Sequence, residues 1–173
     1  MGGRRVACIG NMNNNFFSLV RYLRDKGIDA HLLLRNNEFK HFLPEADSYS
    51  ADYLSYTHQL SWGHVTTWYT TSAHKIESDL REYDFLIGCG TVPAFLDKAG
   101  RNLDLFIPYG SDLYGFPFMR FPWFIPLFFH FSRSQRRAIK KARYICLDFS
   151  NNEFEKPLIR IDISGQRLHP RAP

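Results

Sequence analysis

The segment that most restricts the fold is residues 4–34, where two short apolar runs flank a turn and a helical pattern. Val6–Ile9 is apolar, contains β-branched residues and is too short for a helix, so it is predicted to be a strand. Ile28–Leu34 is a second such run. Two strands joined through a helix form a βαβ unit, and the strands of such a unit pair in parallel. The start of the chain therefore predicts a parallel sheet.

The helix between these runs is indicated by the spacing of its apolar residues. They fall at i, i+3, i+4 and i+7, which places them on one side of a helix: Phe16, Leu19, Val20 and Leu23. Asn14 or Asn15 is expected to cap its start, and Gly27 to end it.

The same alternation continues along the chain. Helices are expected from Ser72 to about Glu82, from Thr91 to Gly100 and over about Pro126 to Arg143, whereas residues 35–71 are less regular. Strands are expected at Phe85–Ile87, at Leu103–Ile107 and in YICLDFS. Four or five strands alternating with helices predict an α/β fold, a Rossmann-like open and mostly parallel sheet flanked by helices.

Composition excludes several classes of protein. With 173 residues, 45% hydrophobic and 23% charged, the chain suits one globular domain. The three cysteines lie in separate apolar runs, which favours buried thiols in a reducing compartment. The histidines have no metal-ligand spacing, and we expect neither a metal nor a cofactor. No apolar run is long enough to span a membrane and no signal peptide is recognised, so a cytoplasmic location is expected.

Three predicted strands end in small or polar residues, in GNMNNN, GCGTVP and PYGSDLYG. In parallel α/β sheets, ligands bind beyond the carboxyl ends of the strands. These loops are therefore the candidate substrate or donor-phosphate contacts, through Gly10, Asn11, Asn13, Gly90, Thr91, Gly110 and Ser111. The first loop is not a GxGxxG fingerprint, because Gly10 is its one glycine, so a dinucleotide site is not indicated. The alternative is that these residues serve only as strand-to-helix turns and caps.

Asp112 is the candidate catalytic residue. A carboxylate at a strand end can act as a base on a hydroxyl group or bind a sugar hydroxyl. The alternative is an Asx-type turn, in which Asp112 caps the segment that follows.

Residues 116–143 combine an aromatic first half with a basic second half. Aromatic anchors followed by a basic amphipathic helix favour adsorption to an anionic membrane surface. The candidate membrane contacts are Phe128, Arg133, Arg136, Arg137 and Lys140. A core-packed helix with a basic solvated face is the alternative. Nucleic-acid binding is disfavoured, because the aromatic residues do not interleave with the basic ones.

Three stretches together resemble the N-terminal, acceptor-side domain of GT-B glycosyltransferases, in particular bacterial polysaccharide and glycolipid enzymes of the retaining, sucrose-synthase-like group. They are GNMNNNFFSLVRYLRDKGIDAHLLL, YDFLIGCGTVPAFLDKAG and LFIPYGSDL. The resemblance implies one half of a two-domain architecture, with Gly10 and Asn11 near the donor diphosphate. It implies a sugar-contacting or catalytic role for Gly110, Ser111 and Asp112, although relatives often carry a histidine there.

The resemblance also implies a division of the chain. Residues 1–150 are expected to form the Rossmann-like domain and residues 151–173 a tail or interdomain linker, with the donor domain absent. The expected function is to bind a glycan or lipid-linked acceptor for transfer from a nucleotide sugar at a membrane face, without activity alone. The alternatives are a non-catalytic membrane-recruiting or acceptor-binding subunit and an unrelated Rossmann-type nucleotide-binding protein.

Overall fold

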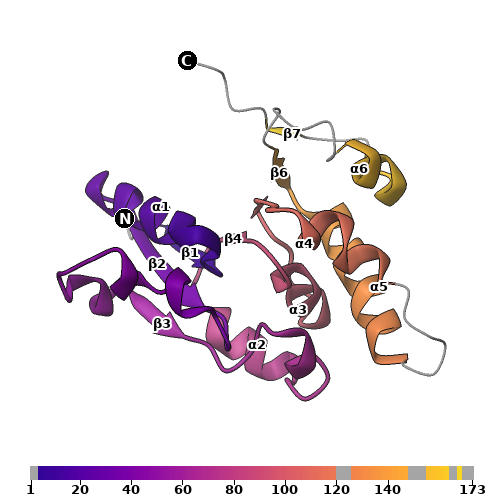
Figure 1. Cartoon of the computed structure of the whole chain (residues 1–173), viewed down its shortest axis with the longest axis horizontal. Coiled ribbons are helices and arrows are strands. Elements are labelled where there is room, and N and C mark those ends of the chain that lie inside the picture. The colour runs from indigo at the N-terminus through magenta and orange to yellow at the C-terminus, as the bar shows by residue number, and fades with distance from the viewer. Residues whose placement is uncertain (1–3, 120–125, 148–154, 164–166, 169–173) are drawn as a thin grey trace.

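The structure is a computed structural model that describes residues 4–119, 126–147, 155–163 and 167–168 (Figure 1). The described strands form one sheet in the order β3-β2-β1-β4-β5-β6-β7, and every neighbouring pair is parallel. The strands are β1 Arg5–Ile9, β2 Asp29–Leu34, β3 Thr57–Gln59, β4 Phe85–Gly88, β5 Leu105–Phe106, β6 Tyr144–Cys146 and β7 Arg167–Leu168. The order 3-2-1-4-5-6 is that of Rossmann folds, which confirms the predicted fold class.

Helices cover both faces of this sheet (Figure 1). Along β1, alternate side chains point to opposite faces: Val6 and Cys8 pack with α1, whereas Ala7 and Ile9 belong to the core that includes α2, α3 and α5. The helices are α1 Asn15–Asp25, α2 Ala73–Leu80, α3 Val92–Lys98, α4 Ser111–Tyr114, α5 Pro126–Lys141 and α6 Glu155–Ile161. Short 3₁₀ turns occupy much of the segment between β2 and α2.

The helix caps differ from the prediction in two places. Asn14 precedes α1 with a φ of 57°, a left-handed conformation in which its side chain makes no capping bond. The amide oxygen of Asn11 accepts the N–H of Phe17 instead, at 2.9 Å. Thr91 precedes α3 as expected but also makes no capping bond, because its hydroxyl turns to the carbonyl of Gly63. Ser72 caps α2 as predicted, by accepting the N–H of Lys75.

Two described segments beyond residue 150 extend the same unit. The side chains of Leu158 and Ile161 on α6 and of Ile163 after it join the main core, and β7 pairs with β6. Part of the stretch expected to be a tail or linker therefore contributes to the sheet and its core. The division at residue 150 and the missing donor domain stay predictions.

Candidate functional site

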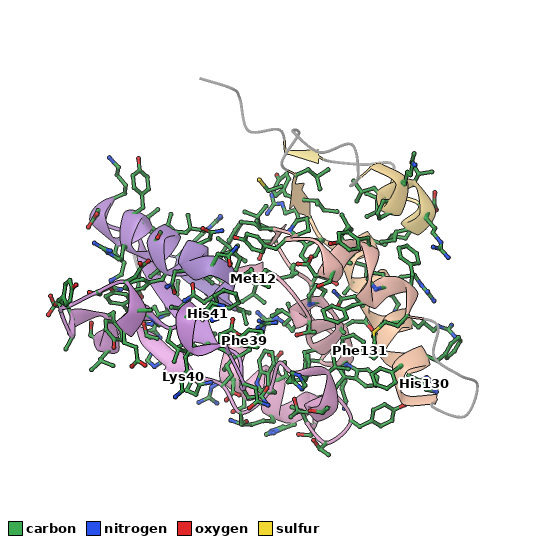
Figure 2. The ribbon with its side chains drawn as sticks, viewed as in Figure 1. Met12, Phe39, Lys40, His41, His130 and Phe131 are labelled. Atoms are coloured by element: carbon green, nitrogen blue, oxygen red, sulfur yellow. The ribbon has the colours of Figure 1, made fainter. Side chains whose placement is uncertain are left out.

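A cavity of about 440 Å³ lies at the carboxyl ends of the central strands. The loops after β1, β2, β3, β4 and β5 all contribute to it, so the three loops named from the sequence meet at one edge of the sheet. Its wall consists of Met12, Arg35, Asn36, Asn37, Glu38, Phe39, Gly63, His64, Val65, Gly90, Thr91, Tyr109, Ser111, Asp112 and Phe116. Figure 2 labels Met12 and Phe39, which come from the loops after β1 and β2.

An ion pair between Arg35 and Glu38 forms one side of the cavity. The side chains are 15% and 2% exposed, and Nη2 of Arg35 lies 2.8 Å from Oε2 of Glu38. Nε of Arg35 donates to the same carboxylate at 3.0 Å, and Nη1 donates to the hydroxyl of Thr91 at 3.3 Å. Burial of such a pair is tolerated because each charge is neutralised by its partner.

Three glycines from different loops make room for the Arg35 side chain. Gly10, Gly63 and Gly90 have positive φ angles of 93°, 120° and 63°. A β-carbon on Gly63 would lie 2.6 Å from Cβ and Cγ of Arg35, and one on Gly90 would lie 2.5 Å from Nη1. The backbone conformation favours glycine at all three positions, and at Gly63 the stem of Arg35 also leaves no space for a side chain.

Asn11 holds the loop after β1 together rather than facing the cavity. Its side chain is buried and donates to Asn14 at 2.7 Å and to the carbonyl of Phe42 at 2.5 Å. These two bonds use both amide hydrogens, so the side chain has no donor left for a ligand, and its amide oxygen accepts the N–H of Phe17. Its backbone N–H donates to Glu38 at 2.8 Å.

Asp112 binds the loops after β4 and β5 to each other. Its carboxylate accepts the N–H groups of Gly90 at 2.9 Å, Tyr109 at 3.0 Å and Gly110 at 2.9 Å. Burial raises the pKa of Asp112, and these three donors oppose the rise. Both carboxylate oxygens are thus occupied by backbone N–H groups. These donors lie before Asp112 or on the loop after β4, so the pattern is not the expected Asx-type turn, in which Asp112 would cap the segment after it.

Gln135 on α5 completes the support behind this loop. Its side chain is fully buried, accepts the N–H of Ala94 at 3.0 Å and donates to the carbonyls of Gly90 at 2.8 Å and Asp112 at 3.1 Å. One amide thereby connects α5 to α3, to α4 and to the loop that carries Gly90.

His64, which follows β3, also lines the cavity. Its Nδ1 accepts the backbone N–H of Thr66 at 3.4 Å and lies 2.7 Å from the Thr66 hydroxyl. Because a backbone N–H can only donate, the neutral ring carries its proton on Nε2. His64 therefore offers an Nε2–H donor on a residue that lines the cavity.

All five predicted membrane contacts lie on the packed helix α5. Phe128 packs partly against the core, and Arg133 is exposed. Arg136 donates to the carbonyl of Pro117 at 2.7 Å, Arg137 to Asp97 at 2.7 Å, and Lys140 to Asp162 at 2.7 Å. The helix interior also contains polar residues that the helical pattern did not identify as buried, namely Ser132, Ser134 and Gln135. No described helix is both long and apolar enough to cross a bilayer.

Four predicted site residues line the cavity: Gly90, Thr91, Ser111 and Asp112. Gly10, Asn11, Asn13 and Gly110 do not, although a β-carbon on Gly10 would lie 3.3 Å from Nε of Arg35, which does. The prediction missed Arg35, Glu38, Phe39, His64 and Gln135. The first three follow the end of β2, so the rule that ligands lie at strand ends could have found them. His64 follows β3, a strand that was not recognised.

Comparisons with known proteins address the fold. No protein-family model and no curated protein matches the chain. Two structures of a short-chain dehydrogenase/reductase from Veillonella parvula, one wide-type in complex with NADP and one ethylated, are each 12% identical. Their TM-scores are 0.41 and 0.43. The matches cover 83% and 84% of this chain and 68% of each of the two solved chains.

A third similar structure comes from work on pinoresinol-lariciresinol and phenylcoumaran benzylic ether reductases. It is 15% identical and has a TM-score of 0.40. The match covers 81% of this chain and 46% of that chain. At such identities and scores the likeness concerns a Rossmann-like arrangement and carries no argument about ligand or reaction. The comparisons give no support to the resemblance to glycosyltransferases.

Proposed function

We propose that the cavity binds an uncharged, polyhydroxylated ligand such as a sugar, and that the chain is the acceptor-binding half of a sugar transferase. The observation that carries this proposal is the position of two buried carboxylates, Glu38 and Asp112. They occupy the backbone N–H groups of Asn11, Gly90 and Gly110 at the strand ends. In nucleotide-binding sheets such N–H groups hold phosphate oxygens.

The protein's own anions therefore take the places at which a ligand's phosphate would bind. A phosphate brought into the cavity would find these N–H groups already taken, and the Asp112 carboxylate would repel it. An uncharged ligand avoids that repulsion. The cavity is lined by groups that exchange hydrogen bonds with hydroxyls, namely Asn36, Asn37, His64 and Ser111.

Aromatic side chains supply the apolar part of the wall. Phe39 is 64% exposed and stands at the cavity with Tyr109 and Phe116. Such aromatic faces pack against the C–H groups of a sugar ring, and polar neighbours orient its hydroxyls. Small-molecule sites commonly combine an apolar lining with a few orienting polar groups. The sequence resemblance to acceptor-side domains supports the transferase part of the proposal, in which a second domain carries the nucleotide sugar.

Substitution of Phe39 tests the proposal directly. The unmodified chain is titrated with mono- and oligosaccharides, with UDP and GDP, and with NADPH, and binding is followed by NMR. Phe39→Ala should weaken sugar binding about tenfold, because a ring contact of this kind contributes about 1–1.5 kcal/mol. The control Tyr22→Ala removes an aromatic side chain of matching exposure, 63%, from α1 and should have no effect. Sugar binding that is as strong in Phe39→Ala as in the unmodified chain would contradict the proposal.

Nucleotide binding is the second candidate, because Arg35 follows β2 in a sheet of Rossmann order. An arginine near that position can accept the 2′-phosphate of NADP. Binding of NADPH or a nucleotide sugar that Arg35→Met abolishes, without any sugar binding, would favour this candidate.

We also propose that α5 brings the chain to an anionic membrane surface. The support is the exposure of Arg133 and the basic residues near it, whereas the ion pairs of Arg137 and Lys140 oppose it. Vesicle binding that rises with the fraction of anionic lipid and falls with salt would support this role. Equal binding to neutral and anionic vesicles would exclude it.

A further inference from the structure

A second cavity, of about 370 Å³, lies between α3, α5 and the turn that carries Trp68. It shares no lining residue with the candidate sugar site. Its wall consists of Trp68, Asp97, Lys98, His130, Arg133, Ser134 and Arg137. In Figure 2 the labelled His130, on α5, lies well away from Met12 and Phe39.

The charges around this cavity are mostly positive. Lys98, Arg133 and Arg137 face one acidic side chain, Asp97, which leaves a formal excess of two positive charges. The Asp97 side chain is 2% exposed and takes a bidentate pair of bonds from Arg137, with Lys141 4.0 Å away. The one carboxylate of the cavity is therefore already neutralised.

Lys98 is held in place by backbone. Its Nζ donates to the carbonyls of Trp68 at 2.5 Å and Tyr69 at 3.3 Å. Burial lowers the pKa of Lys98, because the charged form is poorly solvated there, and a nearby anion would relieve that cost. Two of its three N–H donors are occupied, so one remains for a ligand.

Arg133 is the group best placed to take an anion. It is exposed, and within the described residues its guanidinium makes no hydrogen bond or ion pair. A guanidinium has five N–H donors in a planar fork that matches the oxygens of a phosphate. The hydroxyl of Ser134, on the same stretch of α5, adds a short neutral donor.

We propose that this second cavity binds a phosphate group, of a soluble phosphoester or of a lipid headgroup, through Arg133 with Lys98 and Ser134 beside it. The site is independent of the sugar-binding cavity, so it stands whatever the first cavity binds.

The test is an NMR titration of the whole chain with inorganic phosphate at constant ionic strength, with chloride as the balancing ion. The indole N–H of Trp68, which donates to the carbonyl of Ala94, should shift saturably. The indole of Trp62, bonded to Asp79, should stay unchanged. Arg133→Gln should weaken phosphate binding about tenfold, the loss of one charge-assisted hydrogen bond. Arg21→Gln, an equal change of charge on α1, should leave it unchanged.

Vesicles of phosphatidylcholine with and without phosphatidylglycerol distinguish the two sources of the phosphate. If the anionic vesicles bind and Arg133→Gln weakens that binding, the phosphate belongs to a lipid headgroup. If free phosphate binds and vesicles do not, it belongs to a soluble phosphoester. An unshifted Trp68 indole overturns the proposal, as do equal effects of the two arginine variants or vesicle binding without any response to free phosphate.

Discussion

The guanidinium of Arg35 fills the space that a side chain on Gly90 would need, with Nη1 2.5 Å from the position of its β-carbon. A β-carbon on Gly63 would likewise lie 2.6 Å from Cβ and Cγ of Arg35. The loops after β2, β3 and β4 are thus fitted to one another around a single arginine.

Gly63→Ala should lower the free energy of unfolding by about 2–3 kcal/mol, from left-handed strain and from the clash with Arg35. Gly100→Ala is the control for strain, since Gly100 has a φ of +71° and open space around it. In an Arg35→Gly background the cost of Gly63→Ala should shrink, because both Cβ and Cγ of Arg35 are then absent. Urea denaturation of the four variants measures this, and purely additive effects would show that Arg35 is not the obstacle.

Asp112→Asn should destabilise the chain by about 2–4 kcal/mol, because an amide cannot accept all three N–H groups that the carboxylate accepts. Thermal melting measures the loss, with the exposed Asp47→Asn as control. If the variant melts normally but no longer binds sugar, the role of Asp112 is that of a ligand-binding or catalytic group.

Gln135→Leu should cost about 2–3 kcal/mol, since it leaves the N–H of Ala94 and the carbonyls of Gly90 and Asp112 without their partner. Amide exchange should accelerate at Ala94 first. Arg133→Leu, on the exposed side of the same helix, provides the comparison. Unchanged protection at Ala94 would mean that another group replaces Gln135.

The stability of the chain should fall as the pH is lowered through about 6.5. Burial lowers the pKa of His31 from its ordinary value of 6.5, so the unfolded chain binds the proton more tightly than the folded one. Asp29 favours the charged ring, whereas the charges of Arg5 and His58 disfavour it, and the ring of Tyr83 packs against it.

His31→Gln should reduce this dependence, measured by urea denaturation at about pH 7.5 and pH 5.5. Above about pH 6.5 the neutral ring predominates in both states, so the full contribution of His31 to the free energy of unfolding is present there. As the pH falls toward the folded-state pKa, the unfolded chain takes up the proton first and that contribution is lost. An undiminished pH dependence in the variant would assign it to other groups.

Local patterns were sufficient for the central part of the fold. The strands at β1, β2 and β4 and the helices α1 to α3 were predicted because their apolar spacing agrees with their final burial. Strand β3 was missed because Thr57–Gln59 is polar and largely exposed and is a strand only through its pairing with β2. In β5, pairing covers just Leu105–Phe106, although the apolar run is longer.

The sequence predicted which loops form the candidate site but not how their side chains contact one another. Strand ends identified the loops of Gly90 and Ser111, which line the cavity. The space that Arg35 takes from Gly63 and Gly90 depends on contacts between residues far apart in the sequence, and no local pattern reports such contacts. The inward orientation of Gln135 was hidden for the same reason, since a polar residue among arginines and lysines is expected to face water.

The internal placement of Glu38 and Asp112 also has a consequence for how affinity responds to salt. Ligands held through phosphates are released as ionic strength rises, because mobile ions screen the attraction. In this cavity the charges are paired within the protein and do not depend on the ligand for compensation. Sugar binding at the strand ends should therefore be nearly independent of ionic strength, whereas phosphate binding beside Arg133 should weaken steadily as salt is added.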